Sequence, residues 1–195
     1  MIYIFLGLGN PGVEYFYTRH NAGNLVLRYI AEKENISFSK DKYSNSLLAK
    51  FSLESSSLVF SLPETFMNSS GFTAEKLRTQ NEGSEIVVVY DDIDIPLGEY
   101  KVSFGRSGGS HNGMKSVISS LRSQNFISIR VGVTPKDTEG KIRRPVGKGV
   151  VQDFVMSPFS KNELVILEKL SENIYKTLPT LLKEGREKFL STYKK

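Results

Sequence analysis

His20 is one of only two histidines in the chain, and it follows a short apolar run and a glycine-rich turn at residues 7–12. Ligands bind at the carboxyl ends of strands in open α/β sheets, so the turn that leads to His20 is a candidate active site. Asp91 directly follows the strongest strand-like run, residues 85–90. A carboxylate bound to one ring nitrogen fixes the tautomer and leaves the other nitrogen as a base. Since the chain has no cysteine, the pair most simply activates water, which predicts a hydrolase.

Three asparagines, Asn10, Asn68 and Asn112, lie in turns that border the ends of predicted strands. Neutral amide donors can hold a carbonyl substrate and stabilise the oxyanion that forms on attack. Simpler explanations exist for the same residues. Asparagines beside glycines favour left-handed turns, a single loop histidine is more often structural, and Asp91 beside Asp92 could be a metal ligand or a turn residue. The residue types alone therefore leave both interpretations open.

A serine esterase is the main competing interpretation. Residues 105–109 spell G-x-S-x-G around Ser107, after a predicted strand, as in a nucleophile elbow. The α/β-hydrolase order requires a histidine far downstream of the serine. Only His111 follows, four residues later on the same loop. The spacing therefore favours water over Ser107 as the nucleophile.

Two other glycine patterns resemble nucleotide-binding loops. Residues 7–12 spell G-x-G-x-x-G after a strand, but Pro11 and the next residues delay the helix, so no helix amino terminus would meet a pyrophosphate. Residues 108–113 have the spacing of a phosphate-binding loop, but Met114 stands where its lysine must be. We therefore expect no dinucleotide site and no nucleoside triphosphatase.

The apolar runs at residues 1–6 and 85–90 must lie side by side and parallel if His20 and Asp91 are to meet at one edge of a sheet. Helices and strands alternate along most of the chain, which predicts an α/β fold with a mixed central sheet and helices on both faces. Residues 135–149 are rich in glycine, proline and basic residues and predict a mobile loop. The further predicted strands are 47–53, 57–62, 100–104, 127–133 and 151–156, and the predicted helices are 21–34, 70–80, 113–121, 161–177 and 180–193, the last two separated at Pro179.

Composition bounds the class of protein. A chain of 195 residues fits one domain, and no apolar run approaches the roughly 18 residues of a membrane span. The lack of cysteine excludes disulfides and thiolate metal sites and fits a reducing cytoplasm. Residues 1–129 have a net charge of −1 and residues 130–195 a net charge of +6. A basic C-terminal third is typical of a protein that binds a polyanion, although a solvated helix explains the charge equally well.

Five stretches in collinear order resemble the bacterial peptidyl-tRNA hydrolase family. They are GLGNPGVEYFYTRHNAG, PETFMNSSG, YDDIDIPLG, GRSGGSHNGMKSV and VQDFVMSPF, between residue 3 and about residue 160. The resemblance implies one three-layer α/β/α domain over residues 1–195, with a mostly parallel sheet, in a cytoplasmic monomer without cofactor or metal. It implies hydrolysis of the ester between a peptide and the 3′ ribose of tRNA. A non-catalytic RNA-binding domain on the same fold is the second alternative.

The resemblance also assigns roles to individual positions. His20 matches the family's catalytic base and Asp91 its orienting partner, while the three asparagines match its substrate-binding amides. The loop 135–149 matches a mobile lid. The remaining matches are Tyr15 near the tRNA 3′ end, Met67 in the wall of the peptide groove and Arg130 in a phosphate clamp.

The chain departs from the family pattern at three places outside the catalytic set. Ser103 stands where the family usually has a basic residue, Leu62 where it has lysine, and Thr134-Pro135 where it has a glycine and a basic residue. Lys101, two residues before Ser103 on a predicted strand, is the natural replacement in the phosphate clamp because both side chains point to one face. Arg106 is the second choice.

Overall fold

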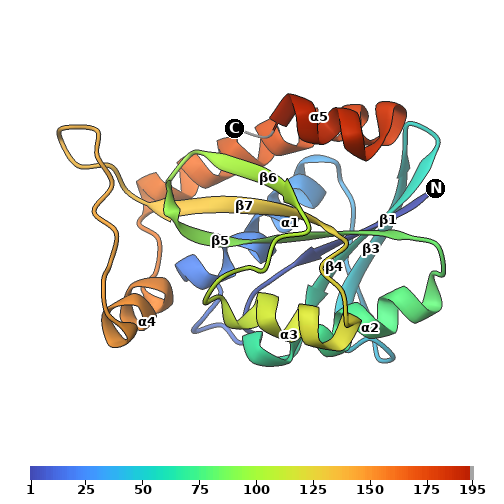
Figure 1. The fold of residues 1–195 in the computed structure, drawn as a ribbon, viewed down its shortest axis with the longest axis horizontal. Helices are drawn as coiled ribbons and strands as arrows, with labels where there is room; N and C mark the ends of the chain where they lie inside the picture. Colours follow the sequence, from blue (N-terminus) through green and yellow to red (C-terminus); the bar gives the residue numbers. More distant parts are fainter. Residues whose placement is uncertain (194–195) are drawn as a thin grey trace.

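The computed structural model describes residues 1–193, which form one seven-stranded sheet between two layers of helices (Figure 1). This is the three-layer α/β/α architecture expected from the sequence. The elements are β1 (Ile2–Gly7), η1 (Arg19–Asn21), α1 (Ala22–Lys33), β2 (Ser39–Asp41), β3 (Ser46–Leu53), β4 (Ser56–Pro63), η2 (Met67–Ser69), α2 (Ser70–Gln80), β5 (Glu85–Pro96), β6 (Tyr100–Phe104), α3 (Asn112–Leu121), β7 (Ile127–Thr134), α4 (Lys148–Met156) and α5 (Lys161–Tyr193).

The sheet has the strand order β2-β3-β4-β1-β5-β7-β6. The four central strands β4, β1, β5 and β7 are parallel, whereas β3 and β6 are antiparallel to their neighbours. Because β2 is antiparallel to β3, it runs with the central four, so the mixed sheet is mostly parallel. The predicted pairing of β1 with β5 is confirmed, with Leu6 opposite Val88 and Gly7 opposite Val89.

Alternation along β1 divides the interior into two cores. Tyr3 and Phe5 pack with α1 and α5 on one face of the sheet, and Ile4 and Leu6 pack with α2 and α3 on the other. Since successive side chains of a strand point to opposite faces, a strand buried on both faces reads as the continuous apolar run seen at residues 2–6. The chain leaves this buried strand directly into the loop that leads to His20.

Residues 151–156 were predicted as a strand, and this prediction is wrong, because they lie in helix α4. The β-branched residues of this segment favour a strand only where a neighbouring strand can satisfy the backbone. The edges of the sheet are β2 and β6, and α4 instead contacts η1. Helical hydrogen bonds satisfy the backbone without a partner strand.

The C-terminal region also differs from the prediction, because one helix, α5, continues through Pro179. Leu178 and Leu181 on either side of the proline are fully buried, and this packing outweighs a cost of about 3 kcal/mol for proline inside a helix. The helix breaks at Gly185, which has a φ of 81° and a ψ of 176°. Glycine adopts such a conformation without a steric penalty.

Two smaller differences concern strand lengths. Residues 36–45, which lie outside the strands and helices predicted from the sequence, contain the short edge strand β2. Strand β5 extends to Pro96 rather than ending at Tyr90, with a register shift against β7 between Asp92 and Pro96. Asp91 therefore lies within a strand, where its backbone is fixed by the ladder with β7.

We expect Gly23→Ala to lower the free energy of unfolding by about 1–3 kcal/mol through overpacking. A Cβ atom at Gly23, in the first turn of α1, would lie 2.0 Å from the carbonyl oxygen of Val89. Urea denaturation followed by circular dichroism measures the effect. Gly149→Ala is the control, since Gly149 lies in helix α4 with open space around it, and it should leave the midpoint unchanged or raise it slightly. Equal midpoints for the two variants would contradict this account of the α1–β5 contact.

Candidate active site

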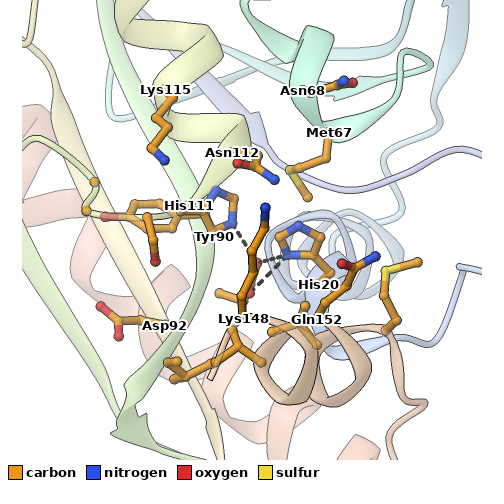
Figure 2. Close-up of a pocket in the computed structure, with 18 of the residues that line it drawn as sticks. His20, Met67, Asn68, Tyr90, Asp92, His111, Asn112, Lys115, Lys148 and Gln152 are labelled. Carbon is orange, nitrogen blue, oxygen red and sulfur yellow. Dashed lines mark hydrogen bonds and ion pairs between the residues drawn. The ribbon is translucent and has the colours of Figure 1, made fainter. Parts of the chain in front are cut away.

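A cavity of about 1060 Å³ opens where β1 and β5 end (Figure 2). Its walls come from separate parts of the chain: the loop after β1, η2, the end of β5, the glycine loop before α3, and one side of α4. His20 and Asp91 both line it. The expectation that these two side chains meet at the carboxyl edge of the sheet is therefore met by the structure.

The His20 ring is held by Asp91 through its Nδ1 atom. This nitrogen lies 2.9 Å from one carboxylate oxygen of Asp91 and 3.1 Å from the other. The Asp91 side chain is only 3% exposed, and that of His20 is 13% exposed. Asp91 is ionised and can only accept, so Nδ1 donates and carries the ring proton. The other nitrogen, Nε2, is then left unprotonated and able to accept a proton.

His111 is the residue that sequence reasoning missed. Its Nε2 lies 2.8 Å from Asp91 Oδ1, and its ring centre is 4.8 Å from that of His20. Its Nδ1 accepts a hydrogen bond of 3.3 Å from the backbone N–H of Met114, which makes His111 the N-cap of α3. Because Nδ1 accepts, Nε2 must carry the proton and donate to Asp91. Its place just before a predicted helix was the one available signal.

The two donors keep Asp91 charged despite its burial. Burial alone raises the pKa of Asp91, but the two histidine rings and their hydrogen bonds outweigh it and hold this pKa well below its usual range. For His20 the balance runs the other way. Burial lowers the pKa of His20, whereas the charge of Asp91 and the hydrogen bond to it raise the pKa, and the net shift is upward. Asp91 thus favours a proton on the His20 ring once the ring has accepted it.

The residue types of this cluster also invite comparison with a metal site. His20, Asp91 and His111 each offer one ligand atom, and these atoms lie within 4.8 Å of one another. A ring nitrogen must lose its proton to bind a metal. Binding through Nε2 of His111 would move its proton to Nδ1 and break the bond from Met114. The contacts of 2.8–2.9 Å to Asp91 are ordinary hydrogen-bond lengths, so the cluster fits a hydrogen-bonded triad better than a metal centre.

Asn10 is oriented by bonds on both its backbone and its side chain. Its Oδ1 accepts from the backbone N–H of Met67 at 2.8 Å. Its backbone N–H and C=O bind the amide of Asn21 at 2.7 and 2.9 Å. The remaining group, the Nδ2 amide, points toward Met156 of α4, with a distance of 4.0 Å to the sulfur. Asn10 therefore presents a hydrogen-bond donor, rather than an acceptor, to the cavity.

The other predicted substrate-binding residues differ in their places. Asn68 and Asn112 are exposed and line the cavity, together with the buried Met67 (Figure 2). Met67 and Asn68 come from η2, and Asn112 begins α3. Tyr15 is half-buried and packs edge-on against Phe66, with ring centres 6.4 Å apart. Of the five predicted substrate-binding residues, all except Tyr15 line the cavity. Tyr15 packs against Phe66, which does line it.

The predicted phosphate-binding residues lie on the neighbouring strands. Lys101 of β6 is directly opposite Arg130 of β7. Arg130 is only 9% exposed and forms an ion pair of 2.9 Å with Asp92. The hydroxyl of Ser103, where the family pattern has a basic residue, is buried. Arg106 is exposed and lines the cavity.

The basic residues near the C-terminal end of α5 lie away from this site. Lys183 and Arg186 pair with Glu54 and Glu85 at 2.9 and 3.0 Å. Glu54 comes just before β4 and Glu85 begins β5, so these pairs lie at the amino ends of the central strands. Of the basic residues in the C-terminal third, Arg144 and Lys148 line the cavity, whereas Lys183 and Arg186 of α5 lie away from it.

Ser107 is poorly placed for a nucleophile. It is exposed, and it is not among the residues that line the cavity, although its neighbours Arg106 and Gly108 are. Within residues 1–193, both histidines direct a ring nitrogen to Asp91 rather than to a serine. The G-x-S-x-G pattern at residues 105–109 is here a loop before a helix, with left-handed glycines at 105, 108 and 109.

The predicted lid is a projecting loop followed by a helix. Residues 135–147 are mostly exposed and extend from the body of the molecule (Figure 1). Arg144 of this loop forms an ion pair of 3.0 Å with Asp94 of β5. Helix α4 begins at Lys148, and its residues 151, 152, 155 and 156 line the cavity. The mobility of the loop stays a prediction.

Within the described residues 1–193, every helix is too short or too polar to cross a membrane.

Comparison with known proteins gives one consistent match. The family model described as peptidyl-tRNA hydrolase matches residues 4–195. The chain is 39% identical to the peptidyl-tRNA hydrolase of Finegoldia magna, over 86% of this chain and 84% of that protein. It is 36% identical to that of Rickettsia canadensis, over 97% of each. The crystal structure of peptidyl-tRNA hydrolase from Acinetobacter baumannii is similar with a TM-score of 0.82 at 26% identity, covering 94% of this chain and 89% of that one.

We expect an NMR titration to give a pKa for His20 above the ordinary value of histidine, because the charge of Asp91 stabilises the imidazolium. In Asp91→Asn the pKa of His20 should fall below the ordinary value, since burial then acts without the opposing charge. Imidazole ¹H–¹³C spectra recorded against pH measure both, and His20→Ala assigns the signal. An unchanged pKa in Asp91→Asn would show that the carboxylate does not control the ring.

Proposed function

Because the chain belongs to the peptidyl-tRNA hydrolase family, we propose that His20 and Asp91 supply the chemistry of that reaction. The protein hydrolyses the ester that joins a peptide to the 3′ ribose of tRNA. The observation that most strongly supports this role of His20 and Asp91 is the contact of His20 Nδ1 with a buried carboxylate that also binds His111.

The reaction begins with proton transfer from water. Nε2 of His20 takes a proton as the water oxygen attacks the ester carbonyl carbon, and the carbonyl oxygen becomes an oxyanion. The C–O bond to the ribose then breaks, and the imidazolium returns its proton to the 3′ oxygen. The products are a peptide with a free carboxylic acid and tRNA with a free 3′ hydroxyl. Asp91 orients the ring and stabilises its charged form between the two steps.

Amide donors are available for the developing negative charge. The Nδ2 group of Asn10 points into the cavity because the Asn10 oxygen is already bound to Met67 N. A neutral donor held in place before the reaction stabilises an oxyanion without reorganisation. We assign this role to Asn10, and we assign the binding of the peptide and the terminal nucleotide to Met67, Asn68, Asn112 and Tyr15.

We place the tRNA phosphates on the β6–β7 side of the cavity. Lys101 and Arg130 lie opposite each other there, and Lys101 is the cation nearest in sequence to the position that Ser103 leaves without charge. Arg130 forms an ion pair with Asp92. This pair orients the guanidinium, and a phosphate would share the guanidinium with Asp92. We further propose that the protein acts as a monomer in the cytoplasm, with the loop 135–147 as a lid over the bound substrate.

We expect His20→Ala to lower the turnover of peptidyl-tRNA by roughly 100- to 10,000-fold, the usual contribution of a general base. The affinity for tRNA should change little, because an imidazole that faces Asp91 is no phosphate anchor. Release of peptide from purified peptidyl-tRNA in the presence of EDTA measures turnover, and filter binding measures affinity.

Ser107→Ala is the matched control, and it should keep turnover within a few-fold of the wild type, with no acyl-enzyme in rapid-quench mass spectrometry. A covalent adduct on Ser107 would overturn the water mechanism. A turnover of His20→Ala above about a third of the wild type would remove His20 from its proposed role, since a general base contributes at least about 100-fold.

We expect Lys101→Ala and Arg130→Ala each to reduce the slope of log K against log salt by about 1, with little change in the rate at saturating substrate. A lost phosphate contact weakens binding to all tRNAs because it releases fewer counterions. Binding is measured at several salt concentrations with two different tRNAs. An unchanged slope for Lys101→Ala, together with a reduced slope for Arg106→Ala, would move the clamp from the strand to the glycine loop.

A further inference from the structure

Arg19, the residue just before His20, has an unusual environment for an arginine. It is only 8% exposed. Its guanidinium lies between two aromatic rings, 5.0 Å from the centre of Phe154 and 4.9 Å from that of Phe159. Its Nη2 donates to Glu163 at 2.8 Å. These three partners come from α4, from the α4–α5 connection and from the first turn of α5.

The backbone on either side of Arg19 is joined to the same region. The N–H of Arg19 donates to the carbonyl of Ser157 at 3.1 Å, and the N–H of Phe159 donates to the carbonyl of Tyr17 at 2.9 Å. Thr18 and Pro158 form an isolated antiparallel β-bridge. Residues 17–19 therefore pair with residues 157–159, directly after the end of α4. The C-terminal end of α4 is therefore joined to the turn that presents His20.

The three residues of η1 bind three different parts of the protein. Arg19 binds the α4–α5 region, His20 binds Asp91 of β5, and Asn21 binds the backbone of Asn10 after β1. Where the His20 ring can reach depends on the position of the His20 backbone, and this position depends on the contacts that hold the η1 turn. Contacts at both neighbouring residues fix the position of the His20 backbone, from which the ring reaches Asp91.

Stability alone does not account for this arrangement. Two nitrogens of the buried guanidinium, Nε and Nη1, have no hydrogen-bond partner within residues 1–193. Apolar side chains often replace buried ion pairs with no loss of stability, so such a pair is weak evidence for a stabilising role. The planar guanidinium does provide a rigid group that fits between two rings and bonds in a fixed direction.

We propose that Arg19 is a positioning residue for His20, which holds the η1 turn against α4 and α5 so that the ring stays on Asp91 and faces the substrate seated on α4. This inference rests on the proposed role of His20 as the base. Arg19 itself touches no reacting atom. Its loss should impair the orientation of the base while leaving the contacts that bind tRNA intact.

Arg19→Met tests the proposal, because it keeps the length of the side chain and its contact with the two rings but removes the charge and the bond to Glu163. We expect kcat to fall about 10-fold or more with KM within about twofold, since a misplacement of about 1 Å can cost 10²-fold in rate. The pKa of His20, read by NMR without substrate, should fall, because a ring that leaves Asp91 stays buried but loses the stabilising charge.

Arg186→Met is a matched control at the other end of the sheet. Arg186 also forms an ion pair, with Glu85 at 3.0 Å, and also lies over an aromatic ring, Phe104, at 4.2 Å. This variant removes the same kinds of contact far from His20. It should leave both kcat and the pKa of His20 unchanged, whatever its melting temperature.

Glu163→Gln tests the same contact from the other side and keeps the proposal testable if Arg19→Met does not fold. It should reduce kcat and lower the pKa of His20 in the same direction, and Arg19→Lys should recover part of both because the charge returns without the planar stacking. Wild-type kcat with an unmoved pKa in Arg19→Met or Glu163→Gln overturns the positioning role and leaves the role of His20 intact. A loss of kcat with no change in pKa, or an equal loss in Arg186→Met, overturns it as well.

Discussion

The carboxylate of Asp91 is the group on which the site depends. It is buried, and it stays charged because two imidazole N–H groups donate to it at 2.8 and 2.9 Å. A buried charge without partners would cost several kcal/mol. Burial of the Asp91 carboxylate therefore requires the hydrogen bonds from His20 and His111. The parallel pairing of β1 with β5 sets the carboxyl ends of both strands at one edge. The ladder with β7 then holds Asp91 itself, opposite Val131.

The width of the cavity follows from close backbone contacts. A Cβ at Gly71 of α2 would lie 2.2 Å from the carbonyl oxygen of Ser116 of α3, so only glycine permits this approach of the two helices. The same glycine donates its N–H to the hydroxyl of Ser116 at 2.9 Å. Because η2 leads into α2 and Asn112 begins α3, the contact brings Met67 and Asn68 near Asn112. The opposite wall, α4, is held at its C-terminal end, because residues 157–159 directly after it pair with residues 17–19.

The departures from the family pattern, at residues 62, 103 and 134–135, lie outside the set of His20, Asp91 and the three asparagines that line the cavity. Ser103 lies opposite Ser128 in the β6–β7 ladder, and both hydroxyls are buried without a partner within residues 1–193. This pair of positions carries no charge. Cations remain close by at Lys101, Arg106 and Arg130, of which Arg130 is already paired with Asp92. Affinity for a polyanion depends on how many cations are near and less on which one, so such a substitution is compatible with the reaction.

The sequence by itself determined the fold class, the central strands and most of the helices, and it predicted the meeting of His20 with Asp91 on the condition that residues 1–6 and 85–90 form neighbouring parallel strands. These features follow from local patterns, since apolar runs and their turns report burial on both faces of a sheet. Only the tertiary structure decided the rest. Residues 151–156 form a helix that contacts η1, and α5 continues through Pro179 because Leu178 and Leu181 are packed in the core. The side-chain partners of His111 and Arg19, Asp91 and Glu163, lie 20 and 144 residues away in the chain. Such contacts depend on where whole elements lie, which no local pattern of residues records.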